Sequence, residues 1–309
     1  MDLFHPENLH AAPQVFATGP LSGKRGRVAC CAIRNQAQHS GLTLVELLMS
    51  MAISSILLVA LGGIVTATQS AWIHSRGIED SQSQVSAAFD RIKMMVSQAG
   101  VYQVSGQTPQ VGLGVVTHTW NFYDVPDTLV VWTGGRNGGI SEQGTLARLP
   151  KMSEILIYTI DPNDKHNLIE VALPESNTDV DFNSSSFKNL IHTAINSDSA
   201  ESALLCNRLK NSQFFLSGTP WGPAAGNLLF GIIKTPSDSS LSGVTVGTSN
   251  WLNLDWPQGT ASASSGLRQV CVQYEAHIEI FERTSLNEVN SKTALPFFGS
   301  CSRLYAHTP

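Results

Sequence analysis

A single carboxylate stands near the beginning of a long apolar segment, and it is the side chain in this chain with the clearest chemistry. Glu46 is the only charged residue between Leu42 and Ala67. A carboxylate inside a membrane costs ~2.5 to 3.5 kcal/mol on insertion scales, so its presence there indicates a function. An amine brought beside Glu46 in a medium of low dielectric constant would attract it strongly. The alternative is a carboxylate that reaches the headgroup region and makes no specific pair.

Other candidate groups carry weaker signals. Asp161-Pro162-Asn163-Asp164 is similar to half of a calcium loop but lacks its glycine and terminal glutamate, which favours a plain hairpin turn. Gly134–Gly139 lacks the Gly-Lys-Ser/Thr of a phosphate loop. The nine histidines show no metal-ligand spacing, and no nucleophile motif occurs. We therefore expect no metal, no cofactor and no catalytic residue, and we predict that the protein is not an enzyme.

The apolar segment is long enough to cross a membrane. Its 26 residues, Leu42–Ala67, would span roughly 39 Å as a helix, more than a ~30 Å hydrocarbon core. The basic residues before it lie closer to the span than the two acidic ones, whereas the charges after Trp72 are mixed. Positive-inside counting places the N-terminus in the cytoplasm and the rest outside it. A cleaved secretory signal fits less well, because the segment is too long and lacks a small-x-small site.

The motif around Glu46 resembles the N-terminal signature of type IV prepilins and pseudopilins. The resemblance rests on the order of residues at the start of the apolar segment, which is Gly41, Leu42, Thr43, Leu44-Val45, Glu46 and Leu47-Leu48. Two features depart from the family pattern. Leu42 stands where the family usually has Phe, and residues 1–41 form a leader much longer than usual, which an initiation codon assigned too far upstream would explain.

The resemblance implies a processing and assembly pathway. A prepilin peptidase is expected to cut between Gly41 and Leu42, and the new α-amine of Leu42 is expected to be methylated. In the family, the glutamate that matches Glu46 guides assembly by pairing with the amine of a neighbouring subunit. The implied partners are prepilin peptidase, other pilins or pseudopilins, and an inner-membrane assembly platform.

Composition agrees with an anchored extracytoplasmic domain. Charged residues make up 14% of the chain and hydrophobic ones 42%, with a net charge of −5. The leader holds four basic and two acidic residues, so its removal leaves 15 basic and 22 acidic residues, a net charge of −7. We expect no nucleic-acid partner, because phosphate binding needs clustered Lys and Arg.

The helical pattern continues beyond the apolar segment. Apolar residues spaced by 4, 3 and 4 positions predict an amphipathic helix that ends near Gly100. Its buried stripe comprises Val85, Phe89, Ile92 and Val96. We predict one helix over 42–98, with 42–67 in the membrane and 72–98 laid on a globular head. Gly62-Gly63 within it indicates either a weak point in the helix or close packing against another helix.

The remainder, residues 99–309, predicts a β-rich head. We expect strands at 129–132, 155–160, 168–173, 228–233 and 270–281, with 297–307 pairing with the last of these. The segment 187–210 is predicted to be helical in two pieces, and 237–243 and 259–266 are predicted to be loops. The expected fold class is α+β, a long N-terminal helix packed on a β-rich domain of about 210 residues.

Three cysteines follow the span. Cys206, Cys271 and Cys301 would lie on the oxidising side, where two of them could pair. C-terminal disulfides are common in pilin heads, so the resemblance favours Cys271 with Cys301. Three buried thiols remain the alternative, and Cys206 could be the partner of either.

The sequence as a whole predicts a minor pilin or pseudopilin of a type IV pilus, a type II secretion pseudopilus or a related filament. It would be a single-pass inner-membrane protein with a periplasmic head before it enters the filament. The alternative is a membrane-anchored extracytoplasmic binding domain or enzyme with a pilin-like anchor.

Overall fold

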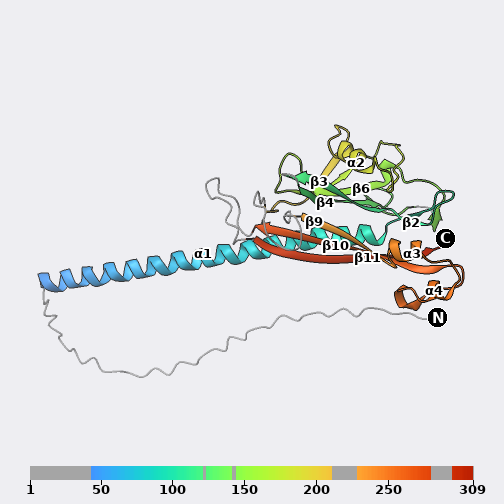
Figure 1. The fold of residues 1–309 in the computed structure, drawn as a ribbon. Helices are drawn as coiled ribbons and strands as arrows, with labels where there is room; N and C mark the ends of the chain where they lie inside the picture. The colour runs from blue at the N-terminus through green and yellow to red at the C-terminus, as the bar shows by residue number, and fades with distance from the viewer. Residues whose placement is uncertain (1–42, 121–122, 141–143, 211–227, 280–293, 309) are drawn as a thin grey trace, which may run out of the picture. The chain divides into compact units, whose positions relative to one another are not determined.

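A computed structural model describes residues 43–120, 123–140, 144–210, 228–279 and 294–308 (Figure 1). The chain divides into two compact units, Met1–Ala60 and Leu61–Pro309. The described part of the first unit is entirely helical apart from Thr43, whereas the second unit contains all of the strands. The fold class is α+β, as the sequence predicts.

Helix α1 runs without interruption from Leu44 to Ser97. Its sequence is rich in Leu, Ala and Met and contains no proline, so every interior amide can bond within the helix. In the second unit one face of α1 is buried, and the spacing of the buried residues follows the 3.6-residue period of a helix. That face consists of Ser81, Val85, Ala88, Ile92, Met95 and Val96.

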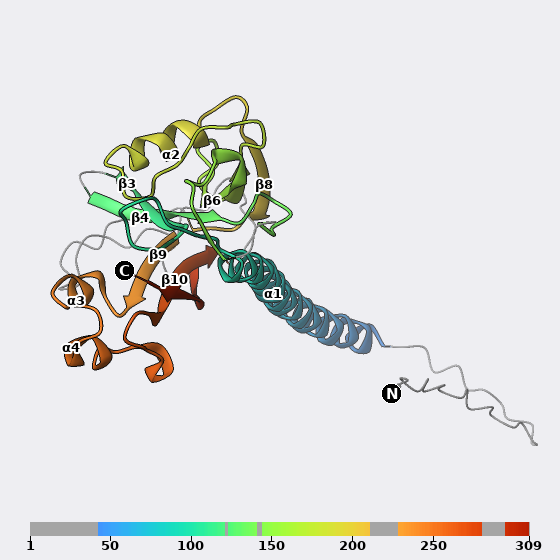
Figure 2. The same ribbon diagram turned by 90° about the vertical axis from the view of Figure 1, so that its right-hand side faces the viewer.

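A five-stranded antiparallel sheet forms the upper layer of the head (Figures 1 and 2). In spatial order it contains β3 (Leu113–Trp120), β4 (Tyr123–Trp132), β6 (Ile155–Ile160), β7 (Leu168–Ala172) and β8 (Glu201–Cys206). Both faces of this sheet are buried. One faces α1, and the other is covered by the short helix α2 (Phe187–Ile195), which lies above the sheet in Figure 2.

The alternation along the central strands explains the two cores. On β4, Leu129 and Val131 enter the core shared with α1, whereas Val130 and Trp132 enter the core under α2. A strand that is buried on both faces needs a continuous apolar run rather than alternation. The runs Leu129–Trp132 and Ile155–Tyr158 have this character, and their side chains are at most 1% exposed.

A second, three-stranded antiparallel sheet packs against the other side of the α1 core. Its order is β11 (Ala294–His307), β10 (Gly266–Glu279) and β9 (Leu228–Thr235). Val270, Val272, Tyr274, Ala276 and Ile278 form the inner face of β10, in strict alternation with residues on the outer face. The predicted pairing of the last two strands is confirmed over 14 residue pairs.

One glycine in this sheet has a steric reason. Gly299 lies opposite Tyr274, and a Cβ atom at position 299 would lie within 3 Å of three atoms of the Tyr274 ring. The ring occupies the space that a side chain would take, and it also packs edge-on against Phe89 of α1, with ring centroids 4.6 Å apart. Gly299 therefore allows a cross-strand contact that ties β10 to the helix.

The remaining elements are small. A third sheet joins β2 (Gln110–Val111), β1 (Val101–Tyr102) and β5 (Thr145–Leu146), with β1 and β5 parallel. A 3₁₀ turn, η1 (Met152–Glu154), precedes β6. Between β9 and β10 the chain forms α3 (Asp238–Ser242), α4 (Ser249–Leu252) and the 3₁₀ turn η2 (Pro257–Gly259).

Arg91 connects α1 to strand β7 of the five-stranded sheet. Its Nε and Nη2 atoms donate to the two carboxylate oxygens of Glu170 on β7, at 2.8 and 3.0 Å. The Glu170 side chain is only 4% exposed, and it also accepts a 3.0 Å hydrogen bond from the Tyr158 hydroxyl. Burial, together with the charge of Glu170, raises the pKa of Tyr158 well above its ordinary value, so the phenol remains a donor.

Two further arginines bind the ends of the packed half of α1. Arg208, just after β8, donates to Asp80 Oδ2 at 2.7 Å and to Ser81 Oγ at 3.1 Å. Arg303 of β11 donates to the carbonyl oxygen of Ser97 at 3.0 Å, where the helix ends and its last carbonyls lack helical partners. The packed half of the helix is therefore held at its beginning and end by cations of the head, and in its middle by its own Arg91 bound to Glu170.

Some predicted elements are wrong. The second helical piece expected within 187–210 is strand β8, because Glu201–Cys206 pairs with the edge of β7 and the short run Ala203-Leu204-Leu205 suits either structure. The predicted loop at 237–243 contains α3, which begins after Ser237 because its hydroxyl accepts a hydrogen bond from the Ser240 amide at 3.0 Å. Strand β3 is missing from the prediction.

The predicted stripe on α1 lies toward the core, with one difference. Val85, Ile92 and Val96 are no more than 2% exposed, whereas Phe89 is only half-buried. Ala88 and Met95 supply the buried positions beside it, and Met95 is 1% exposed. The centre of the buried face is thus rotated from Phe89 toward Ala88, Ile92 and Met95.

We expect Arg91→Leu to destabilise the head strongly, because the change leaves the carboxylate of Glu170 buried without its bidentate partner. The expected loss in free energy of unfolding is about 2 to 4 kcal/mol. This is slightly less than is usual for breaking a buried ion pair, because Arg136 Nε remains 3.8 Å from Glu170. Denaturant unfolding of the full-length protein in detergent, followed by tryptophan fluorescence, measures it. The matched control is Lys93→Leu on the exposed face of α1, expected within ~0.5 kcal/mol of wild type. Equal losses in the two variants would contradict a structural role for the ion pair.

The half-buried position of Phe89 sets an order of mutational effects. Ile92→Ala should cost about 2 to 5 kcal/mol, as expected for a fully buried aliphatic side chain. Phe89→Ala should cost less, about 1 to 3 kcal/mol, because part of the ring is already in water. The same unfolding measurement compares the two, with the 43% exposed Met94 changed to Ala as the control. A larger loss for Phe89 than for Ile92 would show that the ring, not the aliphatic face, dominates the helix contact.

Candidate functional site

The chemistry of the chain's N-terminal region centres on the first turn of α1. Gly41 and Leu42, the predicted cleavage and methylation positions, lie outside the described residues. Thr43 is the first described residue, and the helix begins immediately after it at Leu44. The Leu47 amide donates to the carbonyl oxygen of Thr43 at 3.1 Å, which makes Thr43 the N-cap residue.

Thr43 and Glu46 form a reciprocal capping box. The Glu46 amide donates to Thr43 Oγ1 at 3.3 Å, and the Thr43 amide donates to Glu46 Oε2 at 3.0 Å. The Thr43 hydroxyl also donates to the same carboxylate oxygen at 3.0 Å. Two backbone amides that the helix leaves without partners are thereby satisfied, and the acidic side chain lies at the positive end of the helix dipole.

This capping role adds to the interpretation made from the sequence. The sequence motif predicts that Glu46 pairs with a neighbouring amine, and it assigns Thr43 only a place in the spacing of the motif. The signal that could have revealed the cap is the Thr-x-x-Glu spacing before an apolar run. Because Glu46 already bonds to the residue that follows Leu42, its carboxylate is held close to where cleavage would release an amine.

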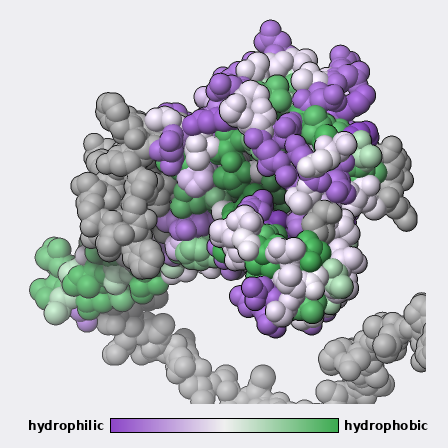
Figure 3. Space-filling view, turned by 45° about the vertical axis from the view of Figure 1, so that its right-hand side comes forward, coloured by the Kyte–Doolittle hydropathy of each residue, from purple (hydrophilic) through white to green (hydrophobic). Residues whose placement is uncertain are grey.

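The apolar half of α1 presents its side chains outward. Between Leu44 and Ile73 the large apolar side chains are 52 to 77% exposed, and the helix is green over this part in Figure 3. Such a surface needs lipid or other helices to cover it. Within the described residues α1 is the one helix long and apolar enough to cross a membrane.

Hydroxyl groups along this half are satisfied within the helix itself. Ser50 donates to the Glu46 carbonyl, Thr66 to the Gly62 carbonyl and Thr68 to the Ile64 carbonyl, each at 2.8 Å. Internal satisfaction of polar groups is the condition for placing a helix in hydrocarbon. The helix also passes through Gly62-Gly63 without a break, and nothing lies within 4 Å of the positions that Cβ atoms would occupy there.

An aromatic side chain lies just beyond the apolar half. Trp72 is 59% exposed, and the guanidinium of Arg76 lies over its ring, 5.2 Å from the centroid. A tryptophan and a cation together suit the boundary between hydrocarbon and headgroups. Their position agrees with a membrane segment that ends before residue 72.

The other sequence candidates do not form chemical sites. Asp161 and Asp164 each accept a hydrogen bond from a backbone amide two residues later, at 2.8 and 3.1 Å, as expected in a turn between β6 and β7. Gly134 and Gly135 have positive φ, and both donate their amides to the Glu154 carbonyl, which fixes this turn against the residues before β6. Within the described ranges, no group of three or more His, Cys, Asp or Glu side chains could hold a metal ion.

The fold brings together two histidines that are far apart in the sequence. His118 of β3 and His192 of α2 lie edge to face with ring centroids 4.2 Å apart, and His118 Nδ1 is 2.5 Å from Asp127 Oδ1. Burial lowers the pKa of His192, and the neighbouring His118 lowers it further. The sequence spacing gave no sign of this pair, because β3 was not predicted.

The predicted disulfide between Cys271 and Cys301 is not formed. Both cysteines are free, as is Cys206. The strand register explains this result, because Cys271 pairs with Ser302 and Cys301 pairs with Val272. A shift of one residue places the two sulfur atoms on opposite faces of the sheet. Burial raises the pKa of Cys301 to about 11, so this thiol stays protonated at neutral pH.

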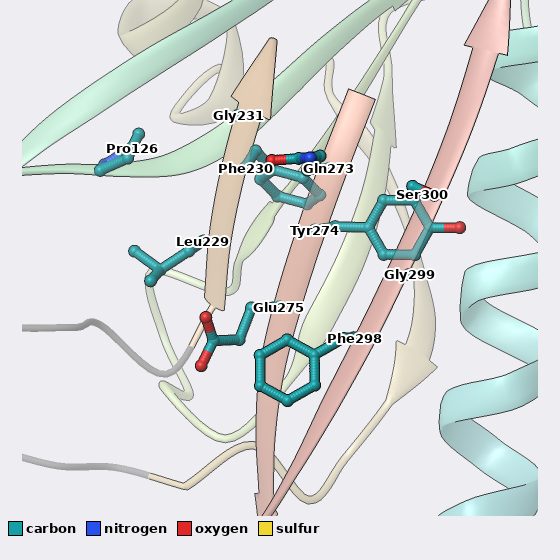
Figure 4. A pocket seen from close by; sticks show the side chains of 10 residues that line it. All are labelled: Pro126, Leu229, Phe230, Gly231, Gln273, Tyr274, Glu275, Phe298, Gly299 and Ser300. Carbon is teal, nitrogen blue, oxygen red and sulfur yellow. The ribbon is translucent and has the colours of Figure 1, made fainter. Parts of the chain in front are cut away.

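The outer face of the three-stranded sheet contains an open groove of about 660 Å³ (Figure 4). Two cross-strand rows border it: Leu229, Glu275 and Phe298 form one, and Gly231, Gln273 and Ser300 form the other. Gly231 and Ser300 of the second row are small and leave the hollow open, and Phe298 beside it is 71% exposed. Sequence reasoning missed this groove, since it depends on the register of three strands.

Comparison with known proteins identifies the motif at the start of α1. The chain matches the prokaryotic N-terminal methylation motif over residues 37–62. Searches of curated proteins and of solved structures found no match to the chain. The chain thus carries the N-terminal motif of type IV prepilin-like proteins, and its long helix packed on β-sheets has a pilin-like architecture. The motif implies a pilin-like protein that prepilin peptidase processes, anchored in a membrane with its head outside the cytoplasm.

Processing at the predicted position gives a direct test. We expect the mature chain to begin at Leu42 with a methylated α-amine, as measured by mass spectrometry of the N-terminal peptide. Gly41→Leu should block cleavage, because a bulky side chain replaces the glycine at the cut, while membrane insertion persists. The control is Gly62→Leu in the same helix, which lies 21 residues from the cut and should leave cleavage unchanged. A wild-type chain that keeps its leader where other prepilins mature would contradict the assignment.

Proposed function

We propose that this protein is a minor pilin or pseudopilin, a subunit of a type IV pilus, a type II secretion pseudopilus or a related filament. The observation that carries the proposal is the methylation motif, whose Thr43 and Glu46 cap an exposed apolar helix. The size of the head supports a minor subunit, since a major pilin usually needs a compact, densely repeating one. A structural role also means that the protein needs no catalytic residue, metal or cofactor.

The proposed life cycle follows from the two halves of α1. Before assembly the chain spans the inner membrane once, with its N-terminus in the cytoplasm and its head in the periplasm. After cleavage, the exposed apolar half would leave lipid only by packing against the same half of other pilins, because water would leave that surface uncovered. Other pilins or pseudopilins and an inner-membrane assembly platform are the partners in this proposal, and nucleic acid is not among them.

Glu46 would act twice in this scheme. Within its own chain it caps α1, and between chains its carboxylate would attract the α-amine of an incoming subunit. The attraction is strong only in a medium of low dielectric constant, which the packed apolar halves would provide. The carboxylate of Glu46 and the α-amine of the neighbour would therefore neutralise each other only when the two helices have the correct axial placement.

We expect Glu46→Gln to leave cleavage intact and to reduce entry into the filament. Glutamine keeps the size of the side chain and can still accept a hydrogen bond at the cap, but it removes the negative charge that a neighbouring amine needs. The measurement is the yield of cross-links to neighbouring pilins in cells, normalised to the amount of mature protein. The matched control is Glu79→Gln, the same change at an exposed position of the same helix. Equal cross-linking in both variants would remove the assembly role of Glu46.

The groove on the head favours a second candidate, a membrane-anchored binding domain. Its volume lies within the range of ligand pockets, and its border combines exposed Phe298 with the carboxylate of Glu275. Cellular fractionation distinguishes the two functions. A filament subunit co-purifies with other pilins in sheared or detergent-extracted filaments, whereas an anchored binding domain stays in the membrane fraction as a single species.

A further inference from the structure

A second, more enclosed cavity of about 140 Å³ lies inside the head. It lies by the inner face of the three-stranded sheet, near the end where Lys234, Arg268 and Tyr305 are located. Residues from β2 and from the segment before α2 close its other side. All of these segments belong to the unit 61–309.

Strand register directs two cations into this cavity. Lys234 of β9 pairs with Val270 of β10, and Arg268 lies two residues before Val270, so both basic residues share the inner face. Arg268 is directly opposite Tyr305 of β11, which also lines the cavity. Further along β9 and β10 the inner-face positions are apolar, so Lys234 and Arg268 mark a local change of chemistry. Arg303 of β11, opposite Val270, is a third cation on this face, and it donates to the carbonyl oxygen of Ser97.

Arg268 is the buried member of the pair, with a residue exposure of 4%. Its Nε donates to the Pro236 carbonyl at 2.9 Å and its Nη2 donates to Asp238 Oδ1 at 2.6 Å. Its Nη1 reaches the Tyr305 hydroxyl only at 3.4 Å, a long and weak hydrogen bond. A guanidinium has five N–H groups, so the described partners leave donor capacity on Nη1.

One carboxylate serves both cations. Asp238 accepts from Arg268 on one oxygen and from Lys234 Nζ at 2.9 Å on the other. Burial alone would raise the pKa of Asp238, but the bonds from Lys234 and Arg268 bring it below its ordinary value. Burial raises the pKa of Tyr305, which keeps its hydroxyl neutral. The charged residues that line the cavity therefore sum to one net positive charge.

Size limits what could neutralise that charge. Pockets for drug-sized ligands and cofactors occupy ~300 to 1,000 Å³, so this cavity is too small for a nucleotide. One water needs ~10 to 15 Å³ of such space, so the cavity has room for several waters or one small polyatomic ion. Asn183 and Gln110, joined by a 2.5 Å hydrogen bond between their side-chain amides, supply further polar groups at its wall.

We infer that this cavity binds a small oxyanion, such as inorganic phosphate or a short carboxylate. Arg268 Nη1, Lys234 Nζ and the Tyr305 hydroxyl are the donors that such an ion would use. Charge-assisted hydrogen bonds of this kind are stronger than those between neutral groups. The oxyanion would join the three-stranded sheet to β2, because residues from both line the cavity.

The alternative is a cavity filled with water, in which Lys234, Asp238 and Arg268 form only a structural ion network. The two possibilities make opposite predictions for Asp238. In a purely structural network its carboxylate is the partner of both cations, and its loss creates no affinity for phosphate. In an oxyanion site it competes with the bound ion, so its removal strengthens binding.

Titration calorimetry of the full-length protein in detergent, with inorganic phosphate and separately with acetate, tests the inference. We expect saturable binding of one ion per chain by at least one of the two probes, and the probe that binds more tightly identifies the class of oxyanion. Lys234→Met should weaken binding about 10- to 100-fold, as expected for one charge-assisted hydrogen bond. Asp238→Asn should strengthen it. Lys93→Met, on the exposed face of α1, should leave it unchanged.

Three results would overturn the inference. These are no saturable binding of either probe to the wild type, equal affinity in Lys234→Met and Lys93→Met, or weaker binding in a folded Asp238→Asn variant. Circular dichroism checks that each variant is folded. The side chains of Lys234 and Asp238 are 37% and 66% exposed, so neither change places a new group in the core. Each of the two variants is therefore a separate test of oxyanion binding.

Discussion

The buried carboxylate of Glu170 determines how the helix and the sheets of the head fit together. It lies on β7 of the five-stranded sheet, 4% exposed, and an ion at such a site is stable only with a charged partner and hydrogen bonds. Arg91 of α1 supplies two of those bonds and Tyr158 of the neighbouring strand supplies a third. Apolar packing is non-directional, so by itself it sets the axial position of α1 only weakly. The bidentate pair allows one axial position, and Arg208 and Arg303 hold the two ends of the packed half in agreement with it.

Helix α1 is one continuous helix, but its first half suits lipid and its second half lies between the protein core and water. Its first half exposes Leu, Ile, Val and Met side chains on every face, and its hydroxyl groups bond to carbonyls of the same helix. Its second half has one buried face and one wet face; Glu79, Asp90 and Lys93 are exposed, whereas Arg91 reaches the buried Glu170. The change falls near Trp72 and Arg76, where an aromatic ring and a cation are stacked. Because lipid requires internal satisfaction of polar groups and water does not, the two halves differ in composition although their geometry is the same.

The sequence predicted those features that depend on local pattern. The length of α1, the hairpin of β6 and β7 and the pairing of β10 with β11 follow from periodicity and turn residues. Features that depend on tertiary neighbours were missed or wrong. Strand β8 has a short apolar run that only the edge of β7 turns into a strand, and the spacing of Cys271 and Cys301 concealed a register that places them on opposite faces. The N-terminal motif was visible in the sequence because its residues are adjacent, whereas the cavity of Arg268 and Lys234 was not, because it draws on β2, β9, β10 and β11.

The same contrast separates the two chemical regions of the molecule. At the start of α1, Thr43 and Glu46 form their hydrogen bonds within one helical turn, so this site needs no folded head to take shape. A local site of this kind can be presented to a peptidase or to a neighbouring helix while the rest of the chain varies. The head is built in the opposite way, from arginine contacts that join α1 to distant strands and loops. Its surface, including the groove beside Phe298, can therefore change without disturbing the motif, provided that Arg91, Arg208 and Arg303 keep their partners.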